Sequence, residues 1–572
     1  MADLDADAVV VGSGPGGSTV ADVLTEAGWD VIVLEKGRNH LIDPEPPHRL
    51  RGEFSNDELK FMHRHFLGPD PLLEPRTYRR SEADGERLAV GEVNNLPSTV
   101  GGGGPHADGK LPRFREEDFS LLSARGPVDG AAVADWPVQY DDLEPHYAEA
   151  ERLIGVAGEA GANPFAAWRS GPYPMSPGPD MFGALLSSEA AVRRGLHPYR
   201  APTGINSVPR DDRPACNDCG FCAHFGCPIH AKGEPVSSLR RALRTGRCDL
   251  RPEAYVTEVL LDAARRRATG VAYLDAGGER RLVRAGHVVL AGGAFETPRL
   301  LLANDVANSS GLVGRHLTFH FQTFVVGAFP FSLHGHRGRS VTHLHDDFIV
   351  PGTDDLVAAK DAGLPWFRGG TVEHGASTLP LQEAKTYPPG VAHTEAMRAS
   401  VLRDKLWVFT MQGEDLPQAG NRVDLDPSVR DAWGRPAGRV TYAPHRHELA
   451  ASAHFAPVLE AVLRDAGAEW TITSTSPPSD DLSRHERNPL GIAPASRHVM
   501  GTCRMGEDPR TSVVGPEGRF HDVENLLCAD SSVFVTSSGY NPTLTLAALA
   551  VRTARLLAGD PRRRDGQPNG SP

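Results

Sequence analysis

The feature that most constrains the fold is a glycine pattern close to the start of the chain. The run AVVVGSGPGG, which begins at Ala8, combines a predicted buried strand with the spacing G-x-G-x-x-G at Gly12, Gly14 and Gly17. A helical pattern follows, and a second apolar run, VIVL, ends at Leu34. This βαβ unit is typical of dinucleotide binding, because the glycines let a pyrophosphate approach the backbone and the helix N-terminus.

An acidic residue completes the predicted unit. Glu35 directly follows the second apolar run, 23 residues after Gly12. A carboxylate at this place accepts hydrogen bonds from ribose hydroxyls and favours an unphosphorylated ribose. Ser13, inside the glycine loop, is a further predicted cofactor-binding residue. The sequence therefore predicts an α/β fold with a Rossmann-like, doubly wound domain.

Composition excludes several classes of protein. The 572 residues carry a formal net charge of −13, whereas a nucleic-acid-binding protein needs a basic face. No apolar run approaches the roughly 20 residues that a membrane span requires. The first residues, MADLDADAVVVGSG, show no signal-peptide pattern, and seven cysteines fit a reducing compartment better than a disulfide scaffold. We expect a cytoplasmic protein with no nucleic-acid partner and no membrane span.

The rest of the chain is less regular. The stretch Pro44–Leu96 is polar and proline-rich, which predicts a meandering cover and few strands. A helical run begins near Thr297, with Pro298 predicted in its first turn. Between residues 318 and 490 strand-like and loop-like stretches alternate, which predicts a second domain of α+β type on a mostly antiparallel sheet.

Four separated segments together resemble one enzyme family. They are the N-terminal βαβ unit, the glycine loop Val100–His106, the run Gly293–Leu302 with Gly311–Arg315, and the segment His498–Gly506 with Asp530 and Asn541–Thr545. The sequence resembles the glucose–methanol–choline (GMC) oxidoreductases, which are FAD enzymes that oxidise alcohol groups. The pairing of His with Asn-Pro is similar to the sugar-oxidising branch of pyranose oxidases and gluconate dehydrogenases.

The resemblance implies two catalytic residues. His498 matches the base that takes the hydroxyl proton while a hydride moves to flavin N5, and Asn541 matches its partner 43 residues later. Histidine suits a base at this position, because its unperturbed pKa of about 6.5 leaves it largely neutral at working pH. Asn541 is expected to hydrogen-bond and orient the substrate oxygen.

The resemblance also implies FAD-contacting residues. Asp530 is expected at the ribityl or pyrophosphate part of FAD, and Val256 at the adenine. His106 matches a histidine that can carry FAD covalently at the 8α carbon, but its neighbours Pro105 and Ala107 are unusual and favour a free cofactor. The complete set of expected contacts comprises Gly12, Ser13, Gly14, Gly17, Glu35, Gly101, Gly102, His106, Val256, Asp530, Pro542 and Thr543.

A cysteine-rich segment allows several interpretations. Its spacing is C-x2-C-x2-C-x4-C-P, formed by Cys216, Cys219, Cys222 and Cys227. Disulfides do not fit a reducing compartment, and zinc sites usually bring together two separated pairs. The spacing differs by one residue from a ferredoxin run that binds an iron–sulfur cluster, and some GMC dehydrogenases carry such a cluster. We favour reduced thiols in a folded loop, with no metal.

These expectations combine into one functional hypothesis. The chain is expected to hold an FAD-binding domain at residues 1–317, a substrate-binding domain at 318–490, a return to the FAD domain at 491–560 and a disordered tail at 561–572. The expected reaction is oxidation of a CH–OH group of a sugar, polyol or glycosylated natural product, with dioxygen or an electron carrier as acceptor. The alternatives are a flavin-containing lyase of the same fold, or a dehydrogenase subunit whose iron–sulfur cluster feeds a cytochrome.

Overall fold

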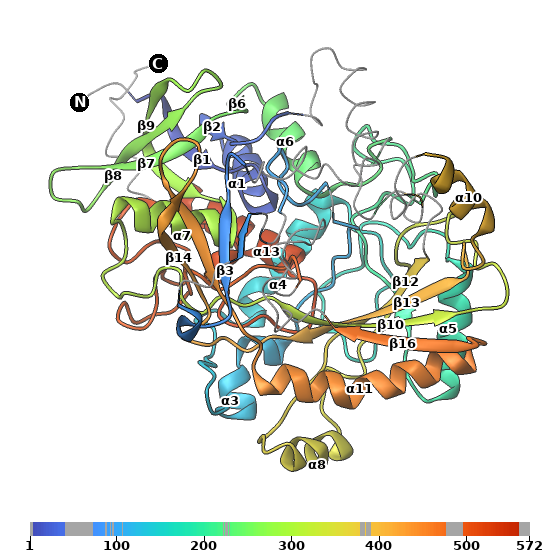
Figure 1. Ribbon diagram of the computed structural model, residues 1–572. Helices are drawn as coiled ribbons and strands as arrows, with labels where there is room; N and C mark the ends of the chain where they lie inside the picture. Colours follow the sequence, from blue (N-terminus) through green and yellow to red (C-terminus); the bar gives the residue numbers. More distant parts are fainter. Residues whose placement is uncertain are drawn as a thin grey trace.

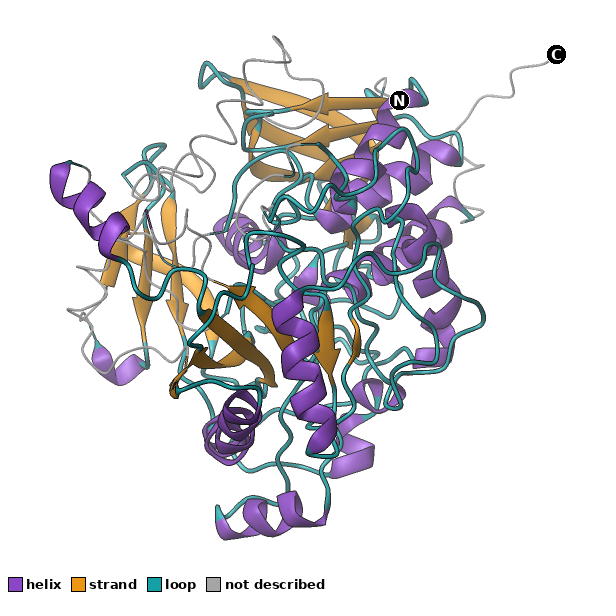
Figure 2. Ribbon diagram, turned by 90° about the vertical axis from the view of Figure 1, so that its right-hand side faces the viewer, coloured by secondary structure: helices purple, strands orange, loops and turns teal. Residues whose placement is uncertain are grey.

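Three sheets organise the described part of the chain (Figures 1 and 2). This computed structural model describes residues 4–39, 72–85, 89–91, 93, 96–105, 107–220, 222, 227, 229–377, 384, 390–475 and 496–559. His106, the expected domain boundary at residue 490 and the expected tail at 561–572 lie outside the described residues.

The first sheet contains the predicted βαβ unit, and its strand order is β6-β2-β1-β9-β8-β7, with β17 also paired to β9. Its strands are β1 (Ala6–Val11), β2 (Val31–Leu34), β6 (Cys248–Arg251), β7 (Tyr255–Leu261), β8 (Ala268–Leu274), β9 (Arg280–Leu290) and β17 (Leu526–Cys528). The neighbours β6, β2, β1, β9 and β17 run parallel, whereas β7 and β8 form an antiparallel extension. The doubly wound domain predicted from the sequence is confirmed.

The helices that pack together beside the first sheet come from distant parts of the chain, including both of its ends. α1 (Pro15–Glu26) packs against α6 (Glu234–Arg244) and against α13 (Thr543–Ala558), which also contacts α4 (Tyr140–Ile154). Most side chains of α1 and α13 are buried, so the C-terminal segment completes the core around the βαβ unit. Further helical segments of the described chain include α3 (Leu121–Arg125), α8 (Thr353–Asp361), α10 (Val391–Ala399), η2 (Glu82–Asp84), η3 (Glu116–Phe119) and η4 (Ser531–Val533).

The second sheet is antiparallel throughout, in the order β16-β10-β13-β12-β11-β5. α11 (Arg446–Asp465) runs along this sheet beside β10 and β16, and α5 (Phe182–Arg193) packs on β11 and β12 (Figure 1). The mostly antiparallel substrate-domain sheet predicted from the sequence is thus present. Its strands are β5 (Tyr199–Arg200), β10 (His320–Ala328), β11 (His343–His345), β12 (Val372–Ser377), β13 (Leu406–Glu414) and β16 (Trp470–Thr475).

A third sheet corrects one expectation. Its order is β14-β15-β3-β4, with β3 (Arg76–Arg79) and β4 (Ala89–Gly91) inside the stretch that was predicted to be a cover with few strands. β3 is buried along its whole length and pairs in parallel with β15 (Pro436–Thr441), which pairs with β14 (Arg422–Arg430). The polar composition hid β3, because its arginine side chains find buried hydrogen-bond partners.

The position of Pro298 also differs from the prediction. α7 (Gly293–Asn304) begins at Gly293, so Pro298 lies inside the helix and not in its first turn. Proline has no backbone N–H and frees the carbonyl four residues earlier. That carbonyl, of Ala294, accepts a hydrogen bond of 2.9 Å from the Thr502 hydroxyl. The proline therefore creates an attachment point for the C-terminal segment that carries His498.

No helix in the described part of the chain combines the length and the apolarity that crossing a membrane requires.

Candidate active site

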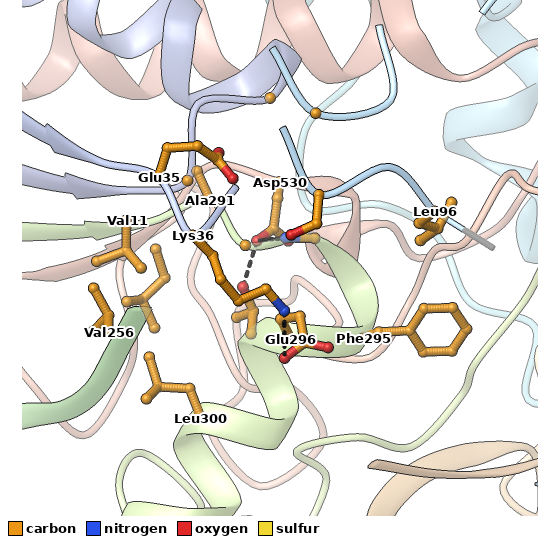
Figure 3. Close-up of a pocket in the computed structure, with 18 of the residues that line it drawn as sticks. Val11, Glu35, Lys36, Leu96, Val256, Ala291, Phe295, Glu296, Leu300 and Asp530 are labelled. Carbon is orange, nitrogen blue, oxygen red and sulfur yellow. Dashed lines mark hydrogen bonds and ion pairs between the residues drawn. The ribbon is translucent and has the colours of Figure 1, made fainter. Parts of the chain in front are cut away.

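A cavity lies where the ends of the parallel strands meet α1 and α7 (Figure 3). This position, at the carboxyl ends of the strands of a doubly wound sheet, is where such folds bind their ligands. Six of the predicted cofactor residues line it: Gly12, Gly14, Glu35, Gly102, Val256 and Asp530.

The glycines of the motif each meet a different physical requirement. Gly12 has a φ of +103°, and a Cβ there would lie 2.4 Å from the Ala291 carbonyl oxygen. A Cβ on Gly17 would lie 2.0 Å from the Gly12 carbonyl oxygen, so this glycine lets helix and strand pack closely. A Cβ on Gly14 would meet no atom within 4 Å, because this glycine faces the open cavity. Gly14 therefore leaves room for a phosphate at the helix N-terminus.

Glu35 connects the glycine motif to the second glycine loop. One of its carboxylate oxygens accepts hydrogen bonds from the Ser13 backbone N–H (3.0 Å) and hydroxyl (2.7 Å), and the other accepts from the Gly37 N–H (2.8 Å). The Ser13 hydroxyl oxygen in turn accepts a hydrogen bond of 3.0 Å from the Gly101 N–H. Gly102 adopts a φ of +56°, and a Cβ there would lie 3.0 Å from the Gly14 Cα. The two glycine loops therefore lie face to face.

Asp530 has a structural role as well as a place in the cavity wall. Its carboxylate accepts hydrogen bonds from the Gly293 N–H (2.9 Å), the Thr297 hydroxyl (2.6 Å) and the Ser532 N–H (2.9 Å). It thereby holds the N-terminus of α7 against the β17 end of the sheet. Figure 3 shows Asp530 directed toward the first turns of α7.

The part of the cavity between Val256 and Lys36 is apolar on one side and charged on the other. Val11, Val256 and Leu300 line the apolar side, which suits the face of an adenine ring (Figure 3). Opposite them Lys36 lies 3.8 Å from Glu296, and this ion pair was not predicted. The Lys36 ammonium and two nearby guanidinium groups lower the pKa of Glu296, although burial opposes that shift.

The predicted base, His498, is not among the residues that line this cavity, and it pairs with a second histidine. Nδ1 of His498 lies 2.8 Å from Nδ1 of His320, the first residue of β10. A short stretch of backbone pairing fixes this approach, because Thr318 and Met500 exchange two hydrogen bonds of 3.0 and 2.9 Å. The Ser496 hydroxyl oxygen also accepts hydrogen bonds from the backbone N–H groups of both histidines.

Both imidazoles are neutral in this environment. Burial lowers the pKa of His320 to about 4. Burial, the neighbouring His320 and the Lys110 ammonium lower the pKa of His498 well below its usual range. A histidine with such a pKa keeps its lone pair available at neutral and mildly acidic pH.

Asn541 is oriented by a buried carboxylate on the antiparallel sheet. Its Nδ2 donates to Oε1 of Glu373 in β12 over 3.2 Å. A carboxylate only accepts, so the amide N–H must face Glu373. The amide oxygen is buried and finds no hydrogen-bond donor among the described residues. A buried acceptor of this kind can accept a hydrogen bond from a hydroxyl group.

Glu373 belongs to a charged network beside the two candidate catalytic residues. Its other oxygen forms an ion pair with Lys110, and the Lys110 ammonium also lies 2.9 Å from the Asp108 carboxylate. Gln412 of β13 donates to Glu373 over 2.8 Å. Burial alone would lower the pKa of Lys110, but Asp108 and Glu373 raise it, so the ammonium stays charged.

The sequence interpretation missed the residues that support the catalytic pair. His320 and Glu373 belong to the region that matches the family motifs loosely, and neither lies in a recognisable pattern. The sequence of β12, VEHGAS, does not alternate apolar and polar residues, and Glu373 is buried like its neighbours Val372 and His374, so the strand gives no signal for the role of Glu373. Pro542 and Thr543 start α13, immediately after Asn541.

The cysteine-rich segment lies against the glycine loop. None of the four cysteines forms a disulfide with a described residue, and the described residues contain no group of His, Cys, Asp or Glu side chains arranged to hold a metal ion. Lys232 links the two regions, because its ammonium donates to the Cys222 carbonyl (3.2 Å), to the Pro105 carbonyl (2.7 Å) and to the Ala107 carbonyl. The buried lysine thus braces the residues on both sides of position 106.

Comparison with known proteins assigns the family. Two family models, both described as GMC oxidoreductase, match residues 200–322 and 417–550. Paromamine 6'-oxidase of Streptomyces fradiae is 31% identical over 97% of this chain and 91% of its own length. 2-Methyl-1,2-propanediol dehydrogenase of Mycolicibacterium austroafricanum is 30% identical over 96% of this chain and 95% of its own. The chain belongs to the GMC oxidoreductase family.

Further comparisons agree with this assignment. The gluconate 2-dehydrogenase flavoprotein of Pantoea cypripedii is 28% identical over 96% of this chain and 93% of its own length. The crystal structure of pyridoxine 4-oxidase from Mesorbium loti superimposes with a TM-score of 0.61 at 16% identity, covering 96% of this chain and 99% of that one. The similarity to pyridoxine 4-oxidase, at this low sequence identity, shows a shared fold only.

Family membership makes the protein an alcohol-oxidising enzyme and supports FAD as its cofactor. The residues in the cavity fit that cofactor. Gly14 leaves space at a helix N-terminus for the pyrophosphate, Glu35 offers carboxylate oxygens for a ribose, and Val256 lies on the apolar side suited to adenine.

Proposed function

We propose that this enzyme oxidises a CH–OH group of a sugar, a polyol or a glycosylated natural product, with His498 as the base and Asn541 as its partner. Two observations carry the proposal: the His498 imidazole is held neutral, and the buried Asn541 amide oxygen finds no donor among the described residues. The ion pair of Lys110 with Glu373 links them, because Lys110 acts on His498 and Glu373 accepts from Asn541. The imidazole can take a hydroxyl proton, and the amide oxygen can accept a hydrogen bond from a hydroxyl group.

The reaction divides between the bound cofactor and the protein. When bound, FAD supplies the acceptor for the hydride that leaves the alcohol carbon. The hydroxyl proton passes to Nε2 of His498, and the carbonyl product forms. Because the pKa of His498 is lowered, the base is available at neutral pH, and the same shift makes the proton easy to release after turnover.

A hydroxyl-rich substrate fits the catalytic end best. Buried polar side chains surround Asn541 there, and Gln412 and Gln322 extend the network through a hydrogen bond of 3.0 Å. Relatives of the chain are named for paromamine, gluconate and 2-methyl-1,2-propanediol, all of which carry hydroxyl groups. They include both oxidases and dehydrogenases, so dioxygen and an electron carrier are both acceptors to be tested.

An anaerobic substrate panel tests the proposal. Holoenzyme is mixed with hexoses, amino sugars, polyols, glycosides and simple alcohols, and the visible flavin absorbance is followed. We expect sugars or polyols to bleach the flavin, and air or an artificial one-electron acceptor to restore the colour. A panel in which only simple alcohols bleach the flavin contradicts the substrate class, and one in which no alcohol does contradicts the reaction.

We further propose that the cysteine-rich segment is a structural brace with reduced thiols and that FAD is not covalently bound. The contacts of Lys232 with both loops support the first part. Anaerobically purified protein is expected to contain little iron and little acid-labile sulfide, and acid denaturation is expected to release FAD from a colourless pellet. Stoichiometric iron, or FAD mass on the peptide that contains His106, would contradict these assignments.

A further inference from the structure

The second histidine of the site has a directional role that its hydrogen bonds reveal. Nε2 of His320 lies 3.1 Å from the Ser537 carbonyl oxygen. A carbonyl oxygen can only accept, so Nε2 of His320 must carry the hydrogen. The opposite nitrogen of a neutral imidazole then holds the lone pair, and Nδ1 of His320 is an acceptor.

The same reasoning extends to His498. The two Nδ1 atoms lie 2.8 Å apart, and a hydrogen bond between them needs one donor. Since Nδ1 of His320 accepts, Nδ1 of His498 must donate. The remaining ring nitrogen of His498, Nε2, therefore holds the lone pair that a base needs.

We propose that His320 is a positioning residue that selects the Nε2 lone-pair tautomer of His498 and holds its ring in place. This inference rests on the proposed role of His498 as the base. The backbone carbonyl of Ser537 is the fixed end of this series of hydrogen bonds. Because it requires a hydrogen on Nε2 of His320, it also determines which ring nitrogen of His498 carries the hydrogen. In other enzymes the tautomer of a histidine is set by the bond that its second nitrogen makes.

The geometry around His320 is rigid enough for this role. The side chain is fully buried, and the two rings lie nearly perpendicular, at 85°, with centroids 4.9 Å apart. Both backbones are held by the Ser496 hydroxyl and by the pairing of Thr318 with Met500. Neither ring can turn without breaking hydrogen bonds inside the protein.

Two substitutions of nearly equal size separate this role from packing. His320→Asn keeps an acceptor near the position of Nδ1, whereas His320→Leu removes it, and both lose the donor to Ser537. We expect the Leu variant to reduce its flavin about 10²-fold more slowly than wild type, since a wrong tautomer can cost up to about 10⁴-fold. The Asn variant should stay within about tenfold of wild type. Equal rates in the two variants would overturn the proposal.

A spectroscopic measurement on the unmodified holoenzyme covers the case in which the variants do not fold. In protein labelled with ¹⁵N-histidine, with His498→Gln protein used for assignment, Nε2 of His498 should show the shift of an unprotonated nitrogen and Nδ1 that of a protonated one. The reverse pattern would overturn the proposal. If His498→Ala retained full activity, the proposed function would fail instead, so the two failures are distinguishable.

Discussion

The cavity lined by the glycine motif, here called the cofactor cleft, differs from the proposed catalytic end, which contains His498 and Asn541. The difference is how far apart along the sequence the interacting residues of each region lie. In the cleft, Ser13 and Glu35 are separated by 22 positions, and a single motif contains both. At the catalytic end, 178 positions separate His320 from His498, and 168 separate Glu373 from Asn541. In the cleft, glycine backbone leaves the open space at the N-terminus of α1, whereas the proposed catalytic end depends on side chains whose orientation other side chains fix.

This difference predicts that the two ends can be damaged separately. A substitution in the glycine motif should remove FAD and leave the antiparallel sheet intact. A substitution at the catalytic end should leave the protein yellow and slow its chemistry. The following predictions test this separation, from the largest expected effect to the smallest.

Gly14→Val should produce the largest effect. A Cβ at position 14 would meet no atom within 4 Å, so the chain should fold, but the valine side chain would fill the space proposed for the pyrophosphate. Losing two hydrogen bonds to a charged phosphate, at about 2 kcal/mol each, would weaken FAD binding by about 10³-fold. Titration of apoprotein with FAD, followed by flavin fluorescence, measures the change.

His498→Ala is the matched control for that titration, since it alters the catalytic end alone. It should bind FAD as wild type does. Wild-type affinity in the Gly14→Val protein would show that the phosphates do not lie at this glycine.

Glu373→Gln should have an intermediate effect. The substitution removes the charge that faces Lys110 and lets the Asn541 amide take either orientation. Loss of a charged buried hydrogen-bond partner costs about 1.5–3 kcal/mol, so kcat/KM should fall by about 10- to 100-fold while FAD binding stays unchanged. Steady-state kinetics with the best substrate of the panel provide the measurement.

Gln322→Leu is a suitable control for this effect, because Gln322 belongs to the same polar network but does not contact Glu373. It should lose less activity. If Glu373→Gln released FAD instead, the two ends of the site would not be separable.

The smallest expected effect concerns acid stability. Burial lowers the pKa of His320 and of His345 to about 4 and that of His447 to about 3. The unfolded chain, with histidine pKa values near 6.5, binds more protons between about pH 6.5 and 4, so stability falls as the pH drops through that window. These histidines therefore lower the midpoint of urea unfolding between pH 7 and pH 5. The buried Asp415, whose pKa burial raises to about 7, contributes in the opposite direction, so the contribution of a histidine is measured by substituting it.

His345→Phe supplies the comparison for the acid effect. Nε2 of His345 is buried and has no hydrogen-bond partner among the described residues, whereas Nδ1 lies 2.7 Å from Nε2 of the buried His374. Phenylalanine therefore keeps the ring packing and removes both the titratable group and that one hydrogen bond. The variant should lose part of the pH dependence. An unchanged pH dependence would show that His345 is not a source of acid sensitivity.

The sequence was sufficient for the parts of the fold that are specified locally. The glycines, the apolar runs and Glu35 lie within one stretch, so the βαβ unit follows from their spacing. β3 was missed because its arginines look solvent-exposed in a sequence, although partners from other strands bury them. Pro298 was placed in the first turn because proline is common there, and only the Thr502 hydroxyl explains its position inside α7.

The candidate site was likewise predictable only where its residues lie in local sequence motifs. His498 and Asn541 were recognisable from the family motifs, although the roles that those motifs assign stay proposals. His320 and Glu373 were not recognisable, because their proximity depends on strand register and on the return of the C-terminal segment, neither of which has a local pattern. Position 106, outside the described residues, stays a sequence-based expectation.

The most direct test of the account is the anaerobic rate of flavin reduction in FAD-loaded His498→Ala protein. General-base catalysis is worth about 10²–10⁴-fold, so the rate constant should fall by that factor while FAD content and unfolding midpoint stay at wild-type values. Reduction at a near-native rate would contradict His498 as the base and with it the central claim.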